Sequence, residues 1–304
     1  MKSFLKANFY FLIVLIIINV VFSFLINALY AGNYKDHSLD FDSYLLADSH
    51  GVSLKNFTEK YGIYNFSEGS DSYFDMKRKL NYLLNHSNID TLYITVDDHT
   101  LSIYREKMNN LDWSTYFTTP EDYSNIYYYI KEKYIVGKIA FFQTKTRSVI
   151  RYYVYSKIKT LFKKNKYIQV GCKTPWHEIA IGERIKESKN RFQLQFPSIN
   201  KSTKLEKSLL EIINICKKNN ILLIGIKFPL SIEYISTLGN RTYKAEEIFK
   251  MRGLQVLDCK SLYIDQSEYF ANQDHLNEKG AYEFVELIFK KSKRMTCCNH
   301  HLND

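Results

Sequence analysis

An uncharged apolar stretch near the N-terminus constrains this chain more than any other feature of its sequence. It runs from Phe9 to Ala31 and follows Lys2 and Lys6. A helix of that length crosses a hydrocarbon layer of about 30 Å. Because lysines precede the stretch and no comparable basic cluster directly follows it, we expect a cytoplasmic N-terminus and an extracytoplasmic remainder.

A cleaved signal peptide is the alternative interpretation of the same stretch. Signal peptides have a shorter apolar region, about 7 to 15 residues, before a small-x-small cleavage site. The surroundings of Ala28 and Ala31 match such a site poorly, so we favour an uncleaved, single-pass anchor over residues 1–31. No second stretch of this length follows. The sequence therefore predicts one extracytoplasmic body, which is periplasmic if the cell has two membranes.

The composition of the body is that of a folded protein. The 304 residues are 45% hydrophobic and 15% aromatic, enough for a sizeable core. A net charge of +10 would suit an anionic partner, but no basic motif of a known nucleic-acid-binding fold accompanies it. We therefore expect no nucleic acid partner. The sequence leaves the oligomeric state open.

Cysteines and histidines near the C-terminus give the only pattern that resembles a metal site. Cys297 and Cys298 are followed by His300 and His301, within a predicted tail at 293–304. Short terminal tails usually fray, so we expect no metal and no other cofactor. The odd cysteine count defines no disulfide framework; the cysteines are Cys172, Cys216, Cys259, Cys297 and Cys298.

Beyond a polar linker at 32–40, apolar stretches with strand character alternate with segments of helical periodicity. This order implies right-handed crossovers and a parallel sheet. We predict an α/β fold over residues 41–292, a flavodoxin-like three-layer sandwich around a parallel sheet of about five strands. The predicted strands are 41–48, 62–67, 90–96, 219–229 and 254–259.

Residues from about 100 to 200 interrupt this alternation and are rich in Tyr, Lys and Arg. We expect helices at 124–134 and 147–166, forming a helical insertion over the carboxyl ends of the strands. The second helix interleaves aromatic and basic residues. That pattern suits an anionic membrane surface or an acidic glycan, and equally the solvated face of a packed helix.

Polar side chains follow several of the predicted strands. Ser49 comes after the first strand, Gly69 after the second and Asp97 after the third, and the segment 272–275 precedes the last helix. In an open parallel sheet, ligands bind at the carboxyl ends of the strands. We therefore expect these residues to gather at one edge of the sheet.

The same segments resemble the signature blocks of the SGNH (GDSL-like) hydrolase superfamily, over about residues 42–291. Ala47-Asp48-Ser49 resembles its Gly-Asp-Ser block, and Asn272-Gln273-Asp274-His275 resembles its Asp-x-x-His block. The following "HLNEKGA" is similar to the membrane-anchored bacterial cell-envelope members. The resemblance implies Ser49 as nucleophile and His275 as base, with the amides of Ser49 and Gly69 in an oxyanion hole.

Two positions depart from the family pattern. The oxyanion asparagine falls on Asp97, whose carboxylate has no hydrogen to donate and would repel a developing negative charge. The catalytic acid falls on Asn272, an amide that can orient an imidazole but stabilises imidazolium less. Asp274 is the alternative partner of His275. A Ser-His dyad held by the main chain is a third arrangement.

The resemblance implies ester chemistry through an acyl-enzyme on Ser49. Water would resolve it in an esterase, and a sugar hydroxyl would resolve it in an O-acyltransferase. The anchor implies a carbohydrate ester as substrate, namely O-acyl and above all O-acetyl groups of an envelope or exported polysaccharide. The competing hypothesis is a non-catalytic scaffold or binding protein of surface polysaccharide assembly.

Structural roles are the alternative interpretation of several of these residues. Ser49 suits the cap of a helix, and His275 could hold a loop by hydrogen bonds. We predict that His50 and His99, each beside a carboxylate, are loop or rim residues rather than catalysts. The spacing of Asp48 and Asp97 supports no metal site in particular.

Overall fold

The computed structural model describes residues 1–26, 28, 31–136, 139, 151 and 174–299. The predicted basic helix at 147–166, apart from Arg151, lies outside the described residues, as do Cys172, His300 and His301. The chain forms two compact units. The first combines Met1–His37 with Asn110–Gly171, and the second combines Ser38–Asn109 with Cys172–Asp304.

The first unit contains the apolar N-terminal helix α1, Lys2–Ile26. It is long and apolar enough to cross a membrane, since 25 residues at about 1.5 Å each extend roughly 37 Å. The helix begins earlier than the predicted stretch because Lys2 and Lys6 are helical too. The other elements of this unit are α2 (Gly32–Lys35), α7 (Leu111–Ser114), η3 (Thr115–Phe117), η4 (Pro120–Asp122), α8 (Ile126–Ile130) and η5 (Lys131–Val136).

Part of the predicted polar linker is structured. Residues Gly32–Lys35 form one helical turn, and Tyr34 in it is 2% exposed. Its ring packs edge-on against Trp113 and tilted against Phe117, with centroids 5.9 and 5.8 Å apart. Such aromatic contacts add to the burial of apolar area. The signal that the sequence analysis overlooked is the aromatic residue in this short segment.

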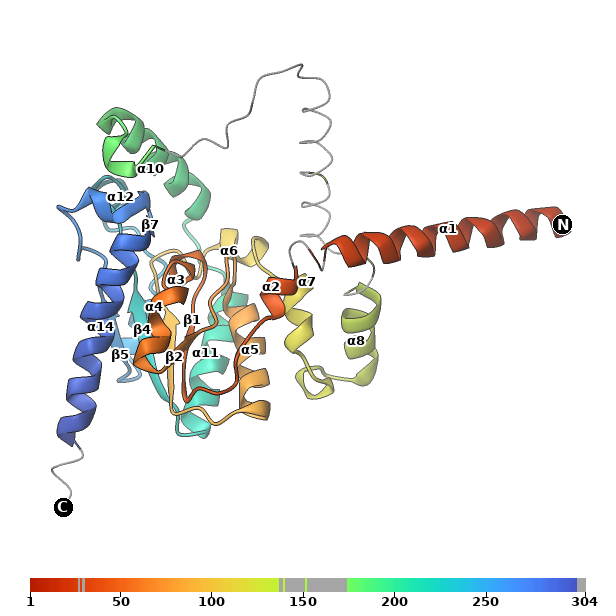
Figure 1. The fold of residues 1–304 in the computed structure, drawn as a ribbon, viewed down its shortest axis with the longest axis horizontal. Coiled ribbons are helices and arrows are strands. Elements are labelled where there is room, and N and C mark those ends of the chain that lie inside the picture. Colours follow the sequence, from red (N-terminus) through yellow and green to blue (C-terminus); the bar gives the residue numbers. More distant parts are fainter. Residues whose placement is uncertain (27, 29–30, 137–138, 140–150, 152–173, 300–304) are drawn as a thin grey trace. The chain divides into compact units, whose positions relative to one another are not determined.

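The second unit is built on a five-stranded parallel sheet in the order β2-β1-β3-β4-β5 (Figure 1). This confirms the predicted α/β class, and the order is the flavodoxin-like one. Backbone pairing aligns Tyr44 of β1 with Tyr64 of β2 and Leu92 of β3. The strands are β1 (Ser43–Leu46), β2 (Ile63–Asn65), β3 (Thr91–Thr95), β4 (Leu222–Lys227) and β5 (Gln255–Asp258).

Helices cover both faces of this sheet (Figure 1). On one side α5 packs against α11, and on the other α4 packs against α14. The remaining long helix, α10, packs against α12. The helical elements are α3 (Ser49–Val52), α4 (Lys55–Thr58), η2 (Glu59–Tyr61), α5 (Tyr73–His86), α6 (Ile103–Lys107), η7 (Trp176–Glu178), α10 (Ile181–Gln195), α11 (Thr203–Lys218), α12 (Ile232–Leu238), α13 (Ala245–Lys250), η8 (Ser267–Tyr269) and α14 (Glu278–Asn299).

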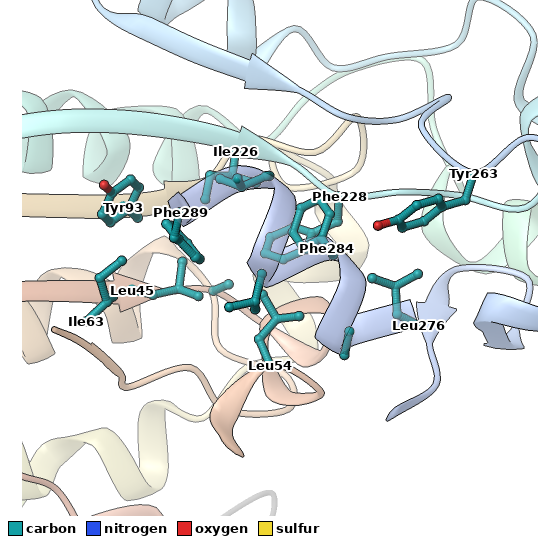
Figure 2. Close-up of a cluster of buried hydrophobic side chains, with 14 of the residues drawn as sticks. Leu45, Leu54, Ile63, Tyr93, Ile226, Phe228, Tyr263, Leu276, Phe284 and Phe289 are labelled. Atoms are coloured by element: carbon teal, nitrogen blue, oxygen red, sulfur yellow. The ribbon is translucent and has the colours of Figure 1, made fainter. Parts of the chain in front are cut away.

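A large apolar cluster joins the sheet to α14 (Figure 2). Strand side chains alternate between faces, so Leu45 points to this cluster while its neighbours Tyr44 and Leu46 do not belong to it. Phe284 and Phe289 contribute rings from α14. An apolar stripe along α14 is buried throughout; it comprises Ala281, Phe284, Val285, Ile288 and Phe289.

Helix boundaries differ from the sequence predictions by about two residues. The helix predicted at 124–134 is observed as α8, Ile126–Ile130, continued by η5, Lys131–Val136. Asn125 caps it, because its side-chain oxygen accepts the amide of Tyr128. Periodicity fixes the face of a helix better than its ends, because neighbouring polar residues cap almost equally well.

Candidate active site

Ser49 lies at the first turn after β1, as predicted, and begins the short helix α3. Asp48 caps this helix because its carboxylate accepts the amide of His50. The turn is packed tightly underneath. A Cβ on Gly51 would lie 2.5 Å from Ser67 Oγ and 2.7 Å from Ala47 Cβ, so only glycine fits there.

His275 comes from the other end of the chain. It begins β7 (His275–Leu276), which pairs antiparallel with β6 (Phe270–Asn272). The amide group of Asn277 fixes the following turn by donating to Glu268 O and accepting from the amide of Gly280. The structure brings His275 Nε2 to 2.8 Å from Ser49 Oγ. Both residues are partly exposed, so a substrate can reach them.

The other ring nitrogen of His275 has two oxygen neighbours. Nδ1 lies 2.9 Å from Asn272 Oδ1, and the contact is a hydrogen bond. It also lies 2.9 Å from Asp274 Oδ1, a contact that becomes ionic when His275 takes up a proton. Asn272 Oδ1 accepts the amide of Asp274 as well, which fixes which end of the Asn272 amide faces the ring. Asn272 therefore orients the imidazole, and Asp274 places a negative charge beside it.

Asp274 is fully buried and bound by groups from α10. Its Oδ2 accepts hydrogen bonds from Arg191 Nε at 2.7 Å and Gln195 Nε2 at 3.0 Å. Burial alone would raise the pKa of Asp274, but His275, His50 and Arg191 hold it well below its ordinary value. The carboxylate is therefore ionised at neutral pH.

Asp97 does not point toward Ser49 as an oxyanion donor. Its Oδ2 is 2.7 Å from His50 Nδ1 and accepts the hydroxyl of Thr95 at 2.9 Å. Its Oδ1 accepts the amide of Phe228 at 2.7 Å. Both oxygens are thus used in holding the interior of the site together.

The other predicted oxyanion donor, Gly69, is also engaged. Its amide donates to its neighbour Glu68 at 3.1 Å, and Glu68 in turn pairs with Lys55 at 2.9 Å. An incoming oxyanion would have to displace Glu68 from this amide. The amide of Ser49 lies at a helix N-terminus, where the first amides have no partner within the helix.

His50 and His99 are buried, contrary to the prediction that they lie on a loop or rim. They are 3% and 4% exposed. His99 Nε2 lies 3.2 Å from Asp48 Oδ2, which also faces Arg105 at 3.5 Å. The prediction placed both rings at the surface because the sequence shows no partner for them. Here each ring finds a carboxylate from another segment of the chain.

Two groups of these side chains have metal-like spacing. The potential ligand atoms of Asp48, His50 and His99 lie within 4.8 Å of one another, as do those of His50, Asp274 and His275. The carboxylates in both groups already accept hydrogen bonds. In the second group, Arg191 also pairs with Oδ2 of Asp274. A guanidinium at 2.7 Å competes with any cation there.

The sequence analysis did not find Arg191 and Gln195. Both come from the region predicted as an insertion, and no chemistry was assigned to it. The signal is the helical spacing of polar residues, because Ser188, Arg191 and Gln195 share one face of α10 and Ser188 and Gln195 are buried. A polar stripe on the buried face of a helix indicates that it faces a polar site.

Comparisons with known proteins do not identify this chain. No family model matches it, and no curated protein matches it either. One similar solved structure is a "putative acylhydrolase" from Bacteroides fragilis, with 7% identity and a TM-score of 0.39 over 89% of this chain and 95% of that chain. So distant a likeness carries no conclusion about activity.

Proposed function

We propose that this protein is a membrane-anchored, serine-dependent esterase or O-acyltransferase of the SGNH type. Its substrates are O-acyl groups, above all O-acetyl groups, of an envelope or exported polysaccharide. The observation that carries the proposal is the 2.8 Å contact between Ser49 Oγ and His275 Nε2, two groups 226 positions apart in sequence. A hydroxyl and an imidazole at this distance form the nucleophile–base pair of acyl transfer.

The proposed reaction has two half-reactions. His275 Nε2 takes the hydroxyl proton while Ser49 Oγ attacks the ester carbonyl, and it then passes the proton to the departing alcohol. The product is an acyl-enzyme on Ser49. Water or a sugar hydroxyl next attacks the acyl carbon and gives its proton to His275. The new acid or ester leaves, and the Ser49 hydroxyl is restored.

The support around His275 divides the work of a triad acid between two residues. In a Ser-His-Asp triad, one carboxylate holds the tautomer and stabilises the imidazolium. Here the amide oxygen of Asn272 holds the tautomer, and the buried carboxylate of Asp274 supplies the charge. Asn272 and Asp274 together would then take the role of the aspartate that the family pattern has at position 272.

A shallow, open hollow lies beside Asn277, which follows β7, and is a place where a sugar chain could rest. Its volume is about 620 Å³, and neither Ser49 nor His275 lines it. Tyr282 is 43% exposed and packs edge-on against Phe57, which gives the hollow an aromatic wall. Glu268, Asn277 and Lys279 supply polar groups. Aromatic rings beside hydrogen-bonding groups suit a carbohydrate chain better than a free fatty acid.

Labelling with a fluorophosphonate probe tests the proposal directly. The full chain in detergent is expected to react once, at Ser49, because only an activated serine attacks the phosphorus. Peptide mass spectrometry locates the label. Ser49→Ala is expected to abolish it, whereas Ser53→Ala is a matched control in which labelling persists.

A specific observation favours the competing scaffold hypothesis. Asp97 and Gly69, the two predicted oxyanion groups other than Ser49, are both bound to protein partners. A folded wild-type protein that takes no label, and that releases no acetate from an O-acetylated glycan, would establish a non-catalytic binding role instead.

The divided support of His275 predicts unequal effects of two substitutions. Asp274→Asn is expected to lower kcat about 100-fold, because the charge that stabilises the imidazolium is lost while Asn272 still holds the tautomer. Asn272→Asp is expected to change kcat less than tenfold, because a carboxylate can hold the tautomer too. Initial rates with an aryl acetate measure both. An equal loss in the two variants would refute the division of roles.

A further inference from the structure

We propose that His50, as a buried cation, is a positioning residue of this site that joins Asp97 to Asp274 and so holds the carboxylate beside His275. This inference rests on the proposed function and extends it to a residue whose side chain is not hydrogen-bonded to the Ser49 hydroxyl. It also assigns a role to Asp97, which departs from the family pattern.

The geometry of the His50 ring favours two protons, because a carboxylate faces each ring nitrogen. Nδ1 lies 2.7 Å from Asp97 Oδ2, and Nε2 lies 3.5 Å from Asp274 Oδ2. A neutral imidazole carries one N–H and turns a lone pair outward at its other nitrogen. A lone pair facing a buried carboxylate is repulsive. With both nitrogens protonated, the ring donates to one carboxylate and faces the other favourably.

Charge balance in the surrounding cluster leads to the same conclusion. Among the groups that pair around the His50 ring, the buried carboxylates are Asp48, Asp97 and Asp274, and Arg105 and Arg191 supply two positive charges. The neighbouring carboxylates of Asp98 and Glu246 are compensated separately, by Lys227 and Lys260. A positive His50 supplies the third positive charge around the ring. Without it, one negative charge would remain uncompensated in the interior, and such charges are strongly destabilising.

The charged and titratable groups that face His50 come from every element around it. They are Asp48 before α3, Asp97 and His99 after β3, and Asp274 and His275 around β7, with Arg105 and Arg191 behind the carboxylates. Asp98, Lys227 at the end of β4 and Lys260 after β5 line the same small cavity as His50. Burial alone would lower the pKa of His50, but Asp48, Asp97 and Asp274 raise it well above its ordinary value. The ionic contacts of His50 therefore persist through neutral pH and are lost only as the pH rises through that higher value.

The positive ring also affects the base. The rings of His50 and His275 are 5.0 Å apart and perpendicular. A positive charge at that distance offsets part of the negative charge that Asp274 places beside His275. His50 therefore has two effects on one residue, because it fixes the position of Asp274 and offsets part of its charge.

His50→Gln tests this role in the full chain. We expect kcat/KM for an aryl acetate to fall about 10- to 100-fold, as when the support of a catalytic group is removed. We also expect the acid limb of the pH profile to move up by about one unit, because His275 then holds its proton to a higher pH. A merely structural role would lower the rate and leave the limb in place.

His99→Gln is the matched control. Its ring is 5.2 Å from His50, but burial lowers the pKa of His99, so this substitution removes no charge. We expect kcat/KM within threefold of wild type and an unmoved acid limb. An identical shift in both variants would overturn the inference, as would a His50→Gln rate within threefold of wild type with an unmoved limb.

A measurement on the unsubstituted side chain covers the case in which His50→Gln fails to fold. Nitrogen NMR of the full chain in nanodiscs, with ring-labelled histidine, is expected to show one doubly protonated imidazole at pH 8. Asp97→Asn is expected to shift its titration to lower pH. A neutral His50 at pH 8 overturns the inference even if Ser49 is labelled. Absence of labelling with a doubly protonated His50 overturns the proposed function alone.

Discussion

Replacing His275 by alanine is expected to lower kcat/KM for ester cleavage by about 10⁴-fold. The hydroxyl of Ser49 then has no base within hydrogen-bond distance, since His275 Nε2 at 2.8 Å is the base that the site provides. The loss is measured from initial rates of aryl acetate hydrolysis by the full chain in detergent. Loss of fluorophosphonate labelling should accompany it, because labelling needs the same proton transfer.

His86→Ala serves as the matched control for that substitution. His86 lies at the exposed end of α5, where its Nδ1 contacts the carbonyl of Tyr82 at 2.7 Å. We expect a rate within twofold of wild type. A His275→Ala protein that is folded and keeps more than a tenth of the activity would show that another group removes the proton.

Replacing Lys79 by methionine is expected to destabilise the second unit by about 3 to 5 kcal/mol. Lys79 is 0% exposed on α5, and its ammonium donates to Asp71 Oδ2 at 2.5 Å and to Phe66 O at 2.8 Å. Without the ammonium, the carboxylate of Asp71 keeps its charge in the interior and loses its main compensation. Chemical denaturation, followed by the fluorescence of Trp176 in a Trp113→Phe background, gives the free energy of unfolding.

Lys77→Met provides the comparison on the same helix. Lys77 pairs with Glu211 at 2.8 Å, but its side chain is 32% exposed and that of Glu211 is 37% exposed. Exposed pairs contribute about 0 to 1 kcal/mol, so little loss is expected. Equal losses in the two variants would mean that the burial of Lys79 and Asp71 is not the source of the effect.

The sheet could be predicted because the composition of each strand is distinctive by itself. A parallel strand buried on both faces is almost continuously apolar, as in Leu222–Lys227, and such stretches stand out between amphipathic helices. Because helices connect the strands, right-handed crossovers then make the sheet parallel. The prediction that polar groups meet at the carboxyl ends follows from that topology, and Ser49 and His275 do meet there.

The interior of the site could not be predicted in the same way. Whether His50 lies inside or outside depends on the carboxylates it meets, and these come from residues 47 and 224 positions away. The same holds for Arg191, which reaches Asp274 from a helix that the sequence analysis treated as an insertion. Buried charges are specified by long-range pairing, and a local pattern cannot reveal the partner.

The turn from β1 into α3 has a consequence for tolerance to deletion. Within Asp48–Gly51, Ser49 alone reaches solvent to an appreciable degree, while its neighbours on either side are enclosed. Removal of one residue between Leu46 and Ser49 would move His50 into the position of Ser49, and Ser49 into the buried position of Asp48. The imidazole would then face water, and the hydroxyl would face the ionic interior. The number of residues at this junction therefore matters as much as their identity.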